Sequence, residues 1–310
     1  MKSPRNKTID LTAEQGAEYL ARCAAPGGEY LNKTILGDTF EALPLLPEGF
    51  KADLVIADPP YNLDKDFGGE AFRRMSDAEY RDYTRRWLSL VRPRMAETGS
   101  IYVCCDWRCS NAVGEVLAEL FTVRNRITWQ REKGRGAAKN WKNSMEDIWF
   151  ATVGDEYTFH LDAVKVRRRV IAPYRENGAP KDWAEDSGGA KYRDTCPGNF
   201  WDDVTVPYWS MPENTAHPTQ KPEKLLAKLI LASSSEGDTV LDPFLGSGST
   251  SVTAKKLGRR YVGIEQNPRY CVWAEKRLET AETDKRIQGF DGGVFRERNA
   301  RVDFSCKAAK

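Results

Sequence analysis

Apolar and polar residues alternate along the chain with two different periods. Short apolar runs bounded by turn residues predict strands, at residues 32–38, 51–62, 100–106, 238–242 and 260–265. Apolar residues three or four positions apart predict helices, at residues 12–23, 80–95, 221–234, 249–258 and 268–280. Strands and helices that follow one another in turn are typical of an α/β fold with a doubly wound, mostly parallel sheet. In such a sheet, ligands bind at the carboxyl ends of the strands.

The segment from Arg124 to Tyr208 departs from this alternation. It carries many glycines, several aromatic residues and many charges, without a sustained period. This pattern predicts a loop-rich insertion between the two halves of the sheet.

The composition is that of a folded protein with a balanced charge. Of the 310 residues, 40% are hydrophobic and 11% aromatic, and 47 basic residues against 45 acidic ones leave a formal net charge of +2. A polyanionic partner would therefore have to be bound by local basic patches. Seven cysteines without a Cys-x-x-Cys pair predict reduced thiols in a cytoplasmic protein, and two histidines exclude a histidine-rich metal centre, so we expect no metal. We find no signal peptide and no apolar run of about 18 residues.

A glycine-containing turn follows the strand at 238–242 and opens the next helix. It has the pattern Phe-x-Gly-x-Gly, and Glu265 ends the following strand at about the spacing of a ribose-binding carboxylate. A nucleoside ligand is therefore predicted, held by Asp242, Phe244, Gly246, Gly248, Ser249, Thr250 and Glu265. Because Ser251 replaces a third glycine and no phosphate-binding lysine follows, the pattern favours S-adenosylmethionine over a pyrophosphate ligand. The alternative is a turn whose glycines serve only the strand-to-helix geometry.

A second turn, Asp58-Pro59-Pro60-Tyr61, ends the strand predicted at 51–62. An exocyclic amino group is a poor nucleophile, and acceptors for its two hydrogens help it to react. The carboxylate of Asp58 and the carbonyl of Pro59 are candidate acceptors, and Tyr61 is a candidate to stack on a base swung out of a duplex. The alternative is a carboxylate that only caps the turn.

Together these two turns resemble those of the amino-methyltransferases of DNA. The catalytic turn precedes the cofactor turn, as in the beta class of that family, and the similarity spans roughly residues 33–280. The resemblance implies a Rossmann-like methyltransferase fold with a circularly permuted motif order. It also implies transfer of a methyl group from S-adenosylmethionine to a flipped base in double-stranded DNA. Asp58 at the first position points to N6 of adenine, and N4 of cytosine stays open as an alternative.

Two further segments match this family. In it, the sequence His-Pro-Thr-Gln-Lys-Pro, here at 217–222, closes over the methionine end of the cofactor, which assigns His217, Thr219 and Lys221 to cofactor binding. Asp38, after the strand at 32–38, resembles the contact to the adenine ring, and Asp58 is assigned to cofactor binding as well as to catalysis. For residues 217–222, the alternative is a helix-entry segment with a surface lysine.

A basic run lies where the family has its DNA-contacting loops. We expect it to bind phosphates through Arg124, Arg126, Arg131, Lys133, Arg135, Lys139 and Lys142, together with Trp141. A second run, residues 165–169, is either a DNA contact or a solvated face. The resulting organisation has an N-terminal helical extension (1–30), a catalytic half (31–132), a target-recognition insertion (133–208), a cofactor-binding half (209–282) and a basic tail (283–310).

The remaining expectations concern partners. The resemblance favours a homodimer over a monomer, with an interface in the aromatic-rich helix at 80–91, and a nucleoid-associated bacterial or phage enzyme with or without a cognate restriction endonuclease. The tail could contact DNA, contact a second subunit or be disordered. A catalytically silent DNA-binding regulator on the same fold is the alternative of another class.

Overall fold

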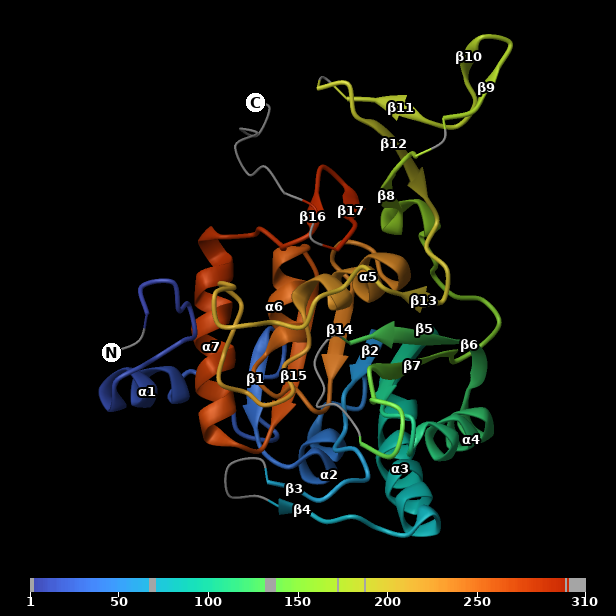
Figure 1. Ribbon diagram of the computed structural model, residues 1–310. Helices are drawn as coiled ribbons and strands as arrows, with labels where there is room; N and C mark the ends of the chain where they lie inside the picture. The colour runs from blue at the N-terminus through green and yellow to red at the C-terminus, as the bar shows by residue number, and fades with distance from the viewer. Residues whose placement is uncertain are drawn as a thin grey trace.

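The computed structural model describes residues 3–66, 71–131, 138–171, 173–186, 188–298 and 300. An eight-stranded sheet with helices on both faces forms the body of the protein (Figure 1). In their order across the sheet the strands are β1 (Lys33–Leu36), β15 (Arg260–Glu265), β14 (Thr239–Asp242), β2 (Ala52–Ala57), β5 (Met95–Cys105), β7 (Met145–Thr152), β6 (Thr122–Gln130) and β13 (Phe200–Trp201). The first five run parallel to one another, and β7 is antiparallel to both β5 and β6. The predicted doubly wound, mostly parallel sheet is confirmed.

Alternation along the central strands divides the core between the two faces of the sheet. In β2, Val55 and Ala57 face one cluster of buried residues, and Leu54 and Ile56 face the other. The first cluster contains α3 (Asp77–Val91) and α4 (Ser110–Leu120). The second contains α5 (Glu223–Ser233), α6 (Ser249–Lys256) and the C-terminal part of α7 (Pro268–Thr283). α1 (Ala13–Leu20) packs against α7.

The chain changes direction between two neighbouring strands. From β2 it continues through α3 to β5 on one side, and from β14 it continues through α6 to β15 on the other. β2 and β14 are paired side by side in parallel, with Leu241 opposite Val55. Crevices at such a switch point are where doubly wound sheets bind ligands.

The predicted insertion needs a correction at its start. Residues 122–130 and 145–152 form the long strands β6 and β7 of the central sheet, so the expected boundary at 133 falls inside a β-hairpin. Polar residues in these two strands interrupt the alternation of apolar and polar positions by which a strand is predicted from sequence. On β7, Asp147 is buried and accepts hydrogen bonds from Ser110 Oγ (2.7 Å) and Thr128 Oγ1 (3.0 Å). α4 was likewise not predicted.

Within the insertion, β13 belongs to the central sheet, whereas residues 166–195 contribute three strands to a second sheet that projects from the body (Figure 1). Its strands, in order across it, are β11 (Ala184–Glu185), β12 (Lys191–Thr195), β8 (Val166–Arg169), β17 (Val294–Arg296) and β16 (Phe290–Asp291). A separate hairpin of β9 (Arg175–Glu176) and β10 (Ala179–Pro180) lies at its far end. We call residues 165–195 the arm.

The described part of the tail belongs to the same sheet as the arm. β17 pairs in parallel with β8, with Phe295 opposite Val166, and the carbonyl of Arg296 accepts a hydrogen bond from Lys224 Nζ (2.5 Å). Phe295 and Val166 are buried with residues of α5. Of the three alternatives for the tail, none anticipated this pairing, and residues 301–310 lie outside the described part.

The expected dimer interface on α3 also needs a correction. Tyr80 and Trp87 are buried in the core of their own chain, and the polar face of the helix is tied to α4 by ion pairs from Arg81 and Arg85. The amphipathic pattern of this helix reflects packing within one subunit. The homodimer itself stays a prediction. Within the described ranges, no helix is both long and apolar enough to cross a membrane.

Candidate active site

The two predicted turns meet in one cavity of about 290 Å³ at the switch point between β2 and β14. Asp58 follows the carboxyl end of β2, and Asp242 ends β14. Both carboxylates line this cavity, together with Tyr61, Phe244 and residues 217 and 219–221 from the segment before α5. We call it the main cavity. The long-range pairing of the strands therefore brings together motifs far apart in the sequence.

The Asp58–Tyr61 turn is held rigidly by side chains around it. Tyr80 donates a hydrogen bond from its hydroxyl to the carbonyl of Pro60 (3.0 Å). The side chain of Asn62 donates to the carbonyl of Met75 (2.9 Å) and accepts from the amide of Met75 (2.7 Å). Because Tyr80 already engages the carbonyl of Pro60, the expected acceptor role on this turn stays with the carbonyl of Pro59.

Both oxygens of the Asp58 carboxylate have a partner. Tyr61 donates its hydroxyl to Oδ1 (2.8 Å), and the ammonium of Lys221 lies 2.6 Å from Oδ2. Burial, together with the nearby carboxylates of Asp58 and Glu146, raises the pKa of the Tyr61 hydroxyl well above its usual value. The hydroxyl is therefore a permanent donor, and the ring is the part of Tyr61 that remains for contact with a base.

The ammonium of Lys221 therefore contacts the catalytic turn, through Asp58. Its side chain is only 7% exposed, and the ammonium has a second carboxylate, Glu146 of β7, at 3.3 Å. Glu146 is 3% exposed and also pairs with Arg131. Sequence reasoning missed Glu146. In the sequence, Glu146 and Asp147 directly precede the apolar residues 148–151. Because an acidic side chain is buried in a strand only when it has a partner, this position indicated a buried pair.

The glycines of the cofactor turn are required by neighbouring atoms. Gly248 has φ 85°, and a Cβ atom there would lie 2.7 Å from Cα of Ala274 in α7. Gly246 has φ 57°, and a Cβ atom would lie 3.1 Å from Nε2 of His217. The turn can therefore approach both α7 and the segment before α5 only without side chains.

Carboxylates fix this turn and line the main cavity. Glu265 accepts hydrogen bonds from the amide of Gly246 (2.7 Å) and the amide of Asn267 (2.8 Å). Asp242 accepts from the amide of Phe244 (2.9 Å), and burial raises the pKa of Asp242 to about 7. Glu265 therefore both shapes the turn and presents its carboxylate to the cavity.

The segment at 217–221 closes over the cavity beside the glycine turn. The ring of His217 packs edge-on against Tyr270, with 4.4 Å between centroids, and its Nδ1 accepts from the amide of Thr219 (3.3 Å). Burial lowers the pKa of His217 to about 4, so the imidazole is neutral at pH 7. His217 and Thr219 line the cavity as expected for cofactor binding.

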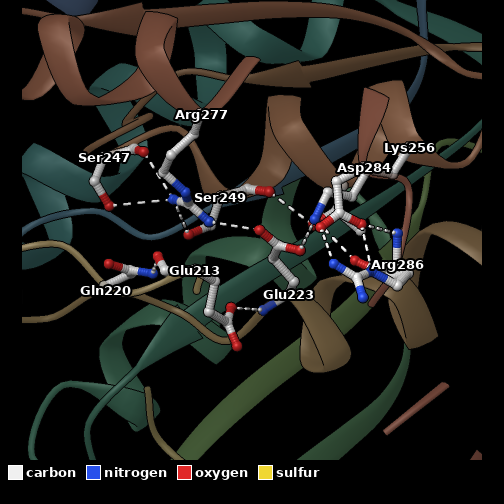
Figure 2. Close-up of polar contacts among 10 residues, drawn as sticks. Glu213, Gln220, Glu223, Ser247, Ser249, Lys256, Arg277, Asp284 and Arg286 are labelled. Carbon is white, nitrogen blue, oxygen red and sulfur yellow. Dashed lines mark hydrogen bonds and ion pairs between the residues drawn. The ribbon is translucent and has the colours of Figure 1, made fainter. Parts of the chain in front are cut away.

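A buried ionic network supports the glycine turn from behind (Figure 2). Arg277 of α7 donates to the carbonyl of Ser247 (2.8 Å), to Oγ of Ser249 (2.9 Å) and to Glu223 (3.0 Å). The other oxygen of Glu223 pairs with Lys256 of α6 at 2.6 Å. Since Glu223 is the first residue of α5, this network links the glycine turn to the segment before that helix.

The same segment is folded back on itself next to this network (Figure 2). The side-chain Nε2 of Gln220 donates to the carbonyl of Glu213 (2.6 Å), and the backbone amide of Glu223 donates to the carboxylate of Glu213 (2.8 Å). Burial and the nearby Glu223 raise the pKa of Glu213 to about 7. The segment is therefore held at both ends.

The residues around the main cavity fit S-adenosylmethionine. The glycine turn presents its backbone at Gly246, where a side chain would strike His217. Phe244 and Phe40 supply apolar surface, and Glu265 supplies a carboxylate for hydroxyl groups. Asp38, assigned to the adenine ring, also lines the cavity, although one of its oxygens caps α2 (Thr39–Ala42) by accepting from Phe40 (2.8 Å). Ser249 and Thr250 complete the lining on the helix side.

The basic residues expected to bind DNA fall into two groups, those whose side chains contact other residues of this chain and those that are exposed. Arg124 donates to Thr152 Oγ1, the carbonyl of Gly154 and the carboxylate of Asp155, and Arg126 lies over the ring of Trp149. These contacts hold the side chains of both arginines against the hairpin of β6 and β7. Arg131 is engaged by Glu146.

The described members of the basic run beyond Arg131 lie in the loop that leads into β7. Lys139, Trp141 and Lys142 are exposed, and the side chain of Trp141 is 94% exposed. Lys133 and Arg135 lie outside the described residues. In the second basic run, Lys165 and Arg167 are paired with Asp162 and Asp194, respectively.

Comparisons with known proteins match most of the chain. Residues 52–276 match the model of a DNA methylase family of the N6/N4 type. DNA adenine methyltransferase YhdJ of Escherichia coli (strain K12) is 36% identical over 261 residues, which cover 80% of this chain and 83% of that protein. The type II methyltransferase M.HpaI of Haemophilus parainfluenzae is 32% identical over 276 residues, covering 88% and 81%.

Solved structures share the fold. M1.HpyAVI, solved in complex with SAM, has a TM-score of 0.52 and 22% identity, and the match covers 79% of this chain and 98% of that one. The cytosine-N4-specific PvuII DNA methyltransferase has a TM-score of 0.58 and 16% identity, with 81% and 89% covered. The predicted fold class is thereby confirmed.

Proposed function

The chain belongs to the DNA methylase family, and from this premise we propose that it methylates the N6 amino group of adenine in double-stranded DNA with S-adenosylmethionine as the methyl donor. The observation that carries the proposal is the shared cavity. The glycine turn and the Asp58–Tyr61 turn line one space, so a cofactor on the first and a base on the second would be in contact.

The residues of the catalytic turn account for the reaction. S-adenosylmethionine supplies the methyl group, and Glu265, Phe244, His217 and Thr219 are the residues we assign to holding it. Asp58 accepts a hydrogen of the amino group, which makes the nitrogen more nucleophilic. The carboxylate can also take the proton that the nitrogen loses once it carries the methyl group.

Adenine is favoured over cytosine by two observations. Asp58 stands first in the catalytic turn, and the relative YhdJ is named as an adenine methyltransferase. The cytosine-N4-specific PvuII enzyme, at 16% identity, is similar in fold alone. The intact catalytic turn and its full set of hydrogen bonds argue against a silent DNA-binding regulator.

The proposal is tested by incubating the purified protein with duplex DNA of mixed sequence and S-adenosylmethionine that carries a labelled methyl group. The DNA is then digested to nucleosides. We expect the label in N6-methyl-2′-deoxyadenosine. Label in N4-methyl-2′-deoxycytidine would support the alternative substrate, and absence of label would support a regulator.

Tyr61 is expected to hold the flipped base through its ring. Tyr61→Ala should lower kcat/KM for DNA by about tenfold to a hundredfold, because stacking of one base is worth about 1–3 kcal/mol. Tyr61→Trp should keep part of the activity, and Tyr61→Phe, which removes only the hydroxyl, is the matched control. Steady-state kinetics with a short duplex measures the effect. Equal losses for the alanine and phenylalanine variants would assign the role to the hydroxyl.

The loop between β6 and β7 is expected to contact DNA phosphates. Lys139→Ala should weaken DNA binding for all sequences and reduce the slope of log Kd against log salt by about one, since one phosphate contact is lost. Lys276→Ala on α7 is the matched control, because it removes the same charge at a residue that does not line the main cavity. Fluorescence anisotropy at several salt concentrations measures both slopes. Equal changes would show that only the net charge matters.

A further inference from the structure

The Lys221 ammonium lies between two carboxylates that belong to different parts of the fold. Asp58 Oδ2, after β2, is at 2.6 Å, and Glu146 Oε2, on β7, is at 3.3 Å. Both Lys221 and Glu146 are nearly fully buried. A small movement of the ammonium would therefore exchange one carboxylate for the other without leaving the charge unpaired.

Glu146 has a cation of its own on its other side. Arg131 pairs with Oε1, so the four groups form a chain of alternating charge, from Asp58 through Lys221 and Glu146 to Arg131. The backbone of Arg131 also closes the hairpin loop by donating to the carbonyl of Ser144 (2.6 Å). The chain of charges thus runs from the catalytic turn to the base of the loop that carries Lys139.

Space for such a movement exists beside Lys221. A second cavity of about 190 Å³ is lined by Arg131, Glu146, Trp129 and residues 214–221. Lys221 lines both this cavity and the main cavity. The side chain of Lys221 therefore borders a cavity that Glu146 also lines.

The position of Lys221 in this structure conflicts with the task of Asp58. Oδ2 of Asp58 is occupied by a cation, whereas the reaction needs that carboxylate as an acceptor for amino hydrogens. The target nitrogen gains positive charge as it accepts the methyl group, and an ammonium paired to the same carboxylate opposes that charge.

We propose that Glu146 is a positioning residue for methyl transfer, which receives the Lys221 ammonium when the target amino group enters and so frees Oδ2 of Asp58 for the amino hydrogens. This inference rests on the proposed function. No proton moves and no bond forms in the exchange, because Lys221 remains an ammonium in both positions. Arg131 pairs with Oε1 of Glu146, which leaves Oε2 to receive the ammonium.

The experiment uses Glu146→Gln, Lys221→Met and the double variant in the methylation assay. Glu146→Gln is expected to lower kcat about tenfold or more while calorimetric affinity for S-adenosylmethionine stays unchanged, because Glu146 acts only through Lys221. In the Lys221→Met background, Glu146→Gln should cause no further loss, because no ammonium is left to receive. Asp147→Asn is the matched control, since Asp147 is a buried acid on the same strand whose partners are the hydroxyls of Ser110 and Thr128.

The outcomes separate the inference from the proposed function. A wild-type protein that transfers no methyl group to adenine contradicts the function itself. With an active wild type, unchanged kcat in Glu146→Gln, or an equal loss in the Lys221→Met background, overturns the inference. If circular dichroism shows Glu146→Gln to be unfolded, Glu146→Asp replaces it. This variant keeps the charge but shortens its reach, and it should lower kcat without changing cofactor affinity.

Discussion

Asp58→Ala is expected to lower the rate of methyl transfer by at least about a hundredfold, which is the scale of losing one preorganised polar group. The variant removes the acceptor for the amino hydrogens. It should fold, because Glu146 remains 3.3 Å from Lys221 and compensates its charge. Affinity for S-adenosylmethionine should be largely intact, since the glycine turn is held by Glu265, Asp242 and Arg277.

Single-turnover transfer of a labelled methyl group measures this loss, and calorimetry measures cofactor affinity. Asp53→Ala is the matched control, because Asp53 lies on the same strand β2 but accepts its hydrogen bond from the amide of Thr239 (2.8 Å), away from the main cavity. It should transfer methyl groups at the wild-type rate. Near-wild-type turnover of Asp58→Ala would remove this carboxylate from the mechanism.

Gly248→Ala is expected to disrupt cofactor binding and to lower the free energy of unfolding by about 2–5 kcal/mol, the sum of a left-handed backbone and an overpacked contact. The added Cβ would lie 2.7 Å from Cα of Ala274, and the backbone of α7 cannot yield as a side chain can. The glycine turn would have to move away from α7, which would break the bonds from Arg277 to Ser247 and Ser249.

Gly237→Ala separates the two contributions. Gly237 has nearly the same φ, 86°, but no atom lies within 4 Å of an added Cβ. It should therefore lose only about 1–2 kcal/mol and keep its affinity for the cofactor. Urea denaturation and calorimetry measure both variants. Equal losses in stability and unchanged cofactor affinity would show that close packing against α7 is not what requires Gly248.

The parts of the fold predicted from sequence are those with a local signal. The apolar runs of β2 and β14 and the glycine and proline turns that follow them identified both halves of the site. That both turns lie at the carboxyl edge of one sheet was inferred from the alternation of strands with helices. No local sequence pattern shows that β2 and β14 are neighbours, because the pairing of Leu241 with Val55 joins residues on opposite sides of the insertion.

The parts that were missed depend on partners far away in the sequence. Glu146 looks like a surface residue until Lys221 and Arg131 are placed beside it. Arg124 looks like a phosphate contact until Thr152 and Asp155 are placed beside it. In each case the residue type was visible, whereas its partner was supplied by the tertiary fold.

The pairing of β17 with β8 bears on whether the arm can be exchanged between related proteins. The arm is not a self-contained cassette, because its innermost strand is completed by residues from the other end of the chain. A chimera that grafts residues 165–195 alone would leave β8 with a foreign or mismatched neighbour, and the burial of Val166 against Phe295 would be lost. Evolutionary or engineered swaps of the arm must therefore carry residues 287–298 with it, as two separated segments inherited together.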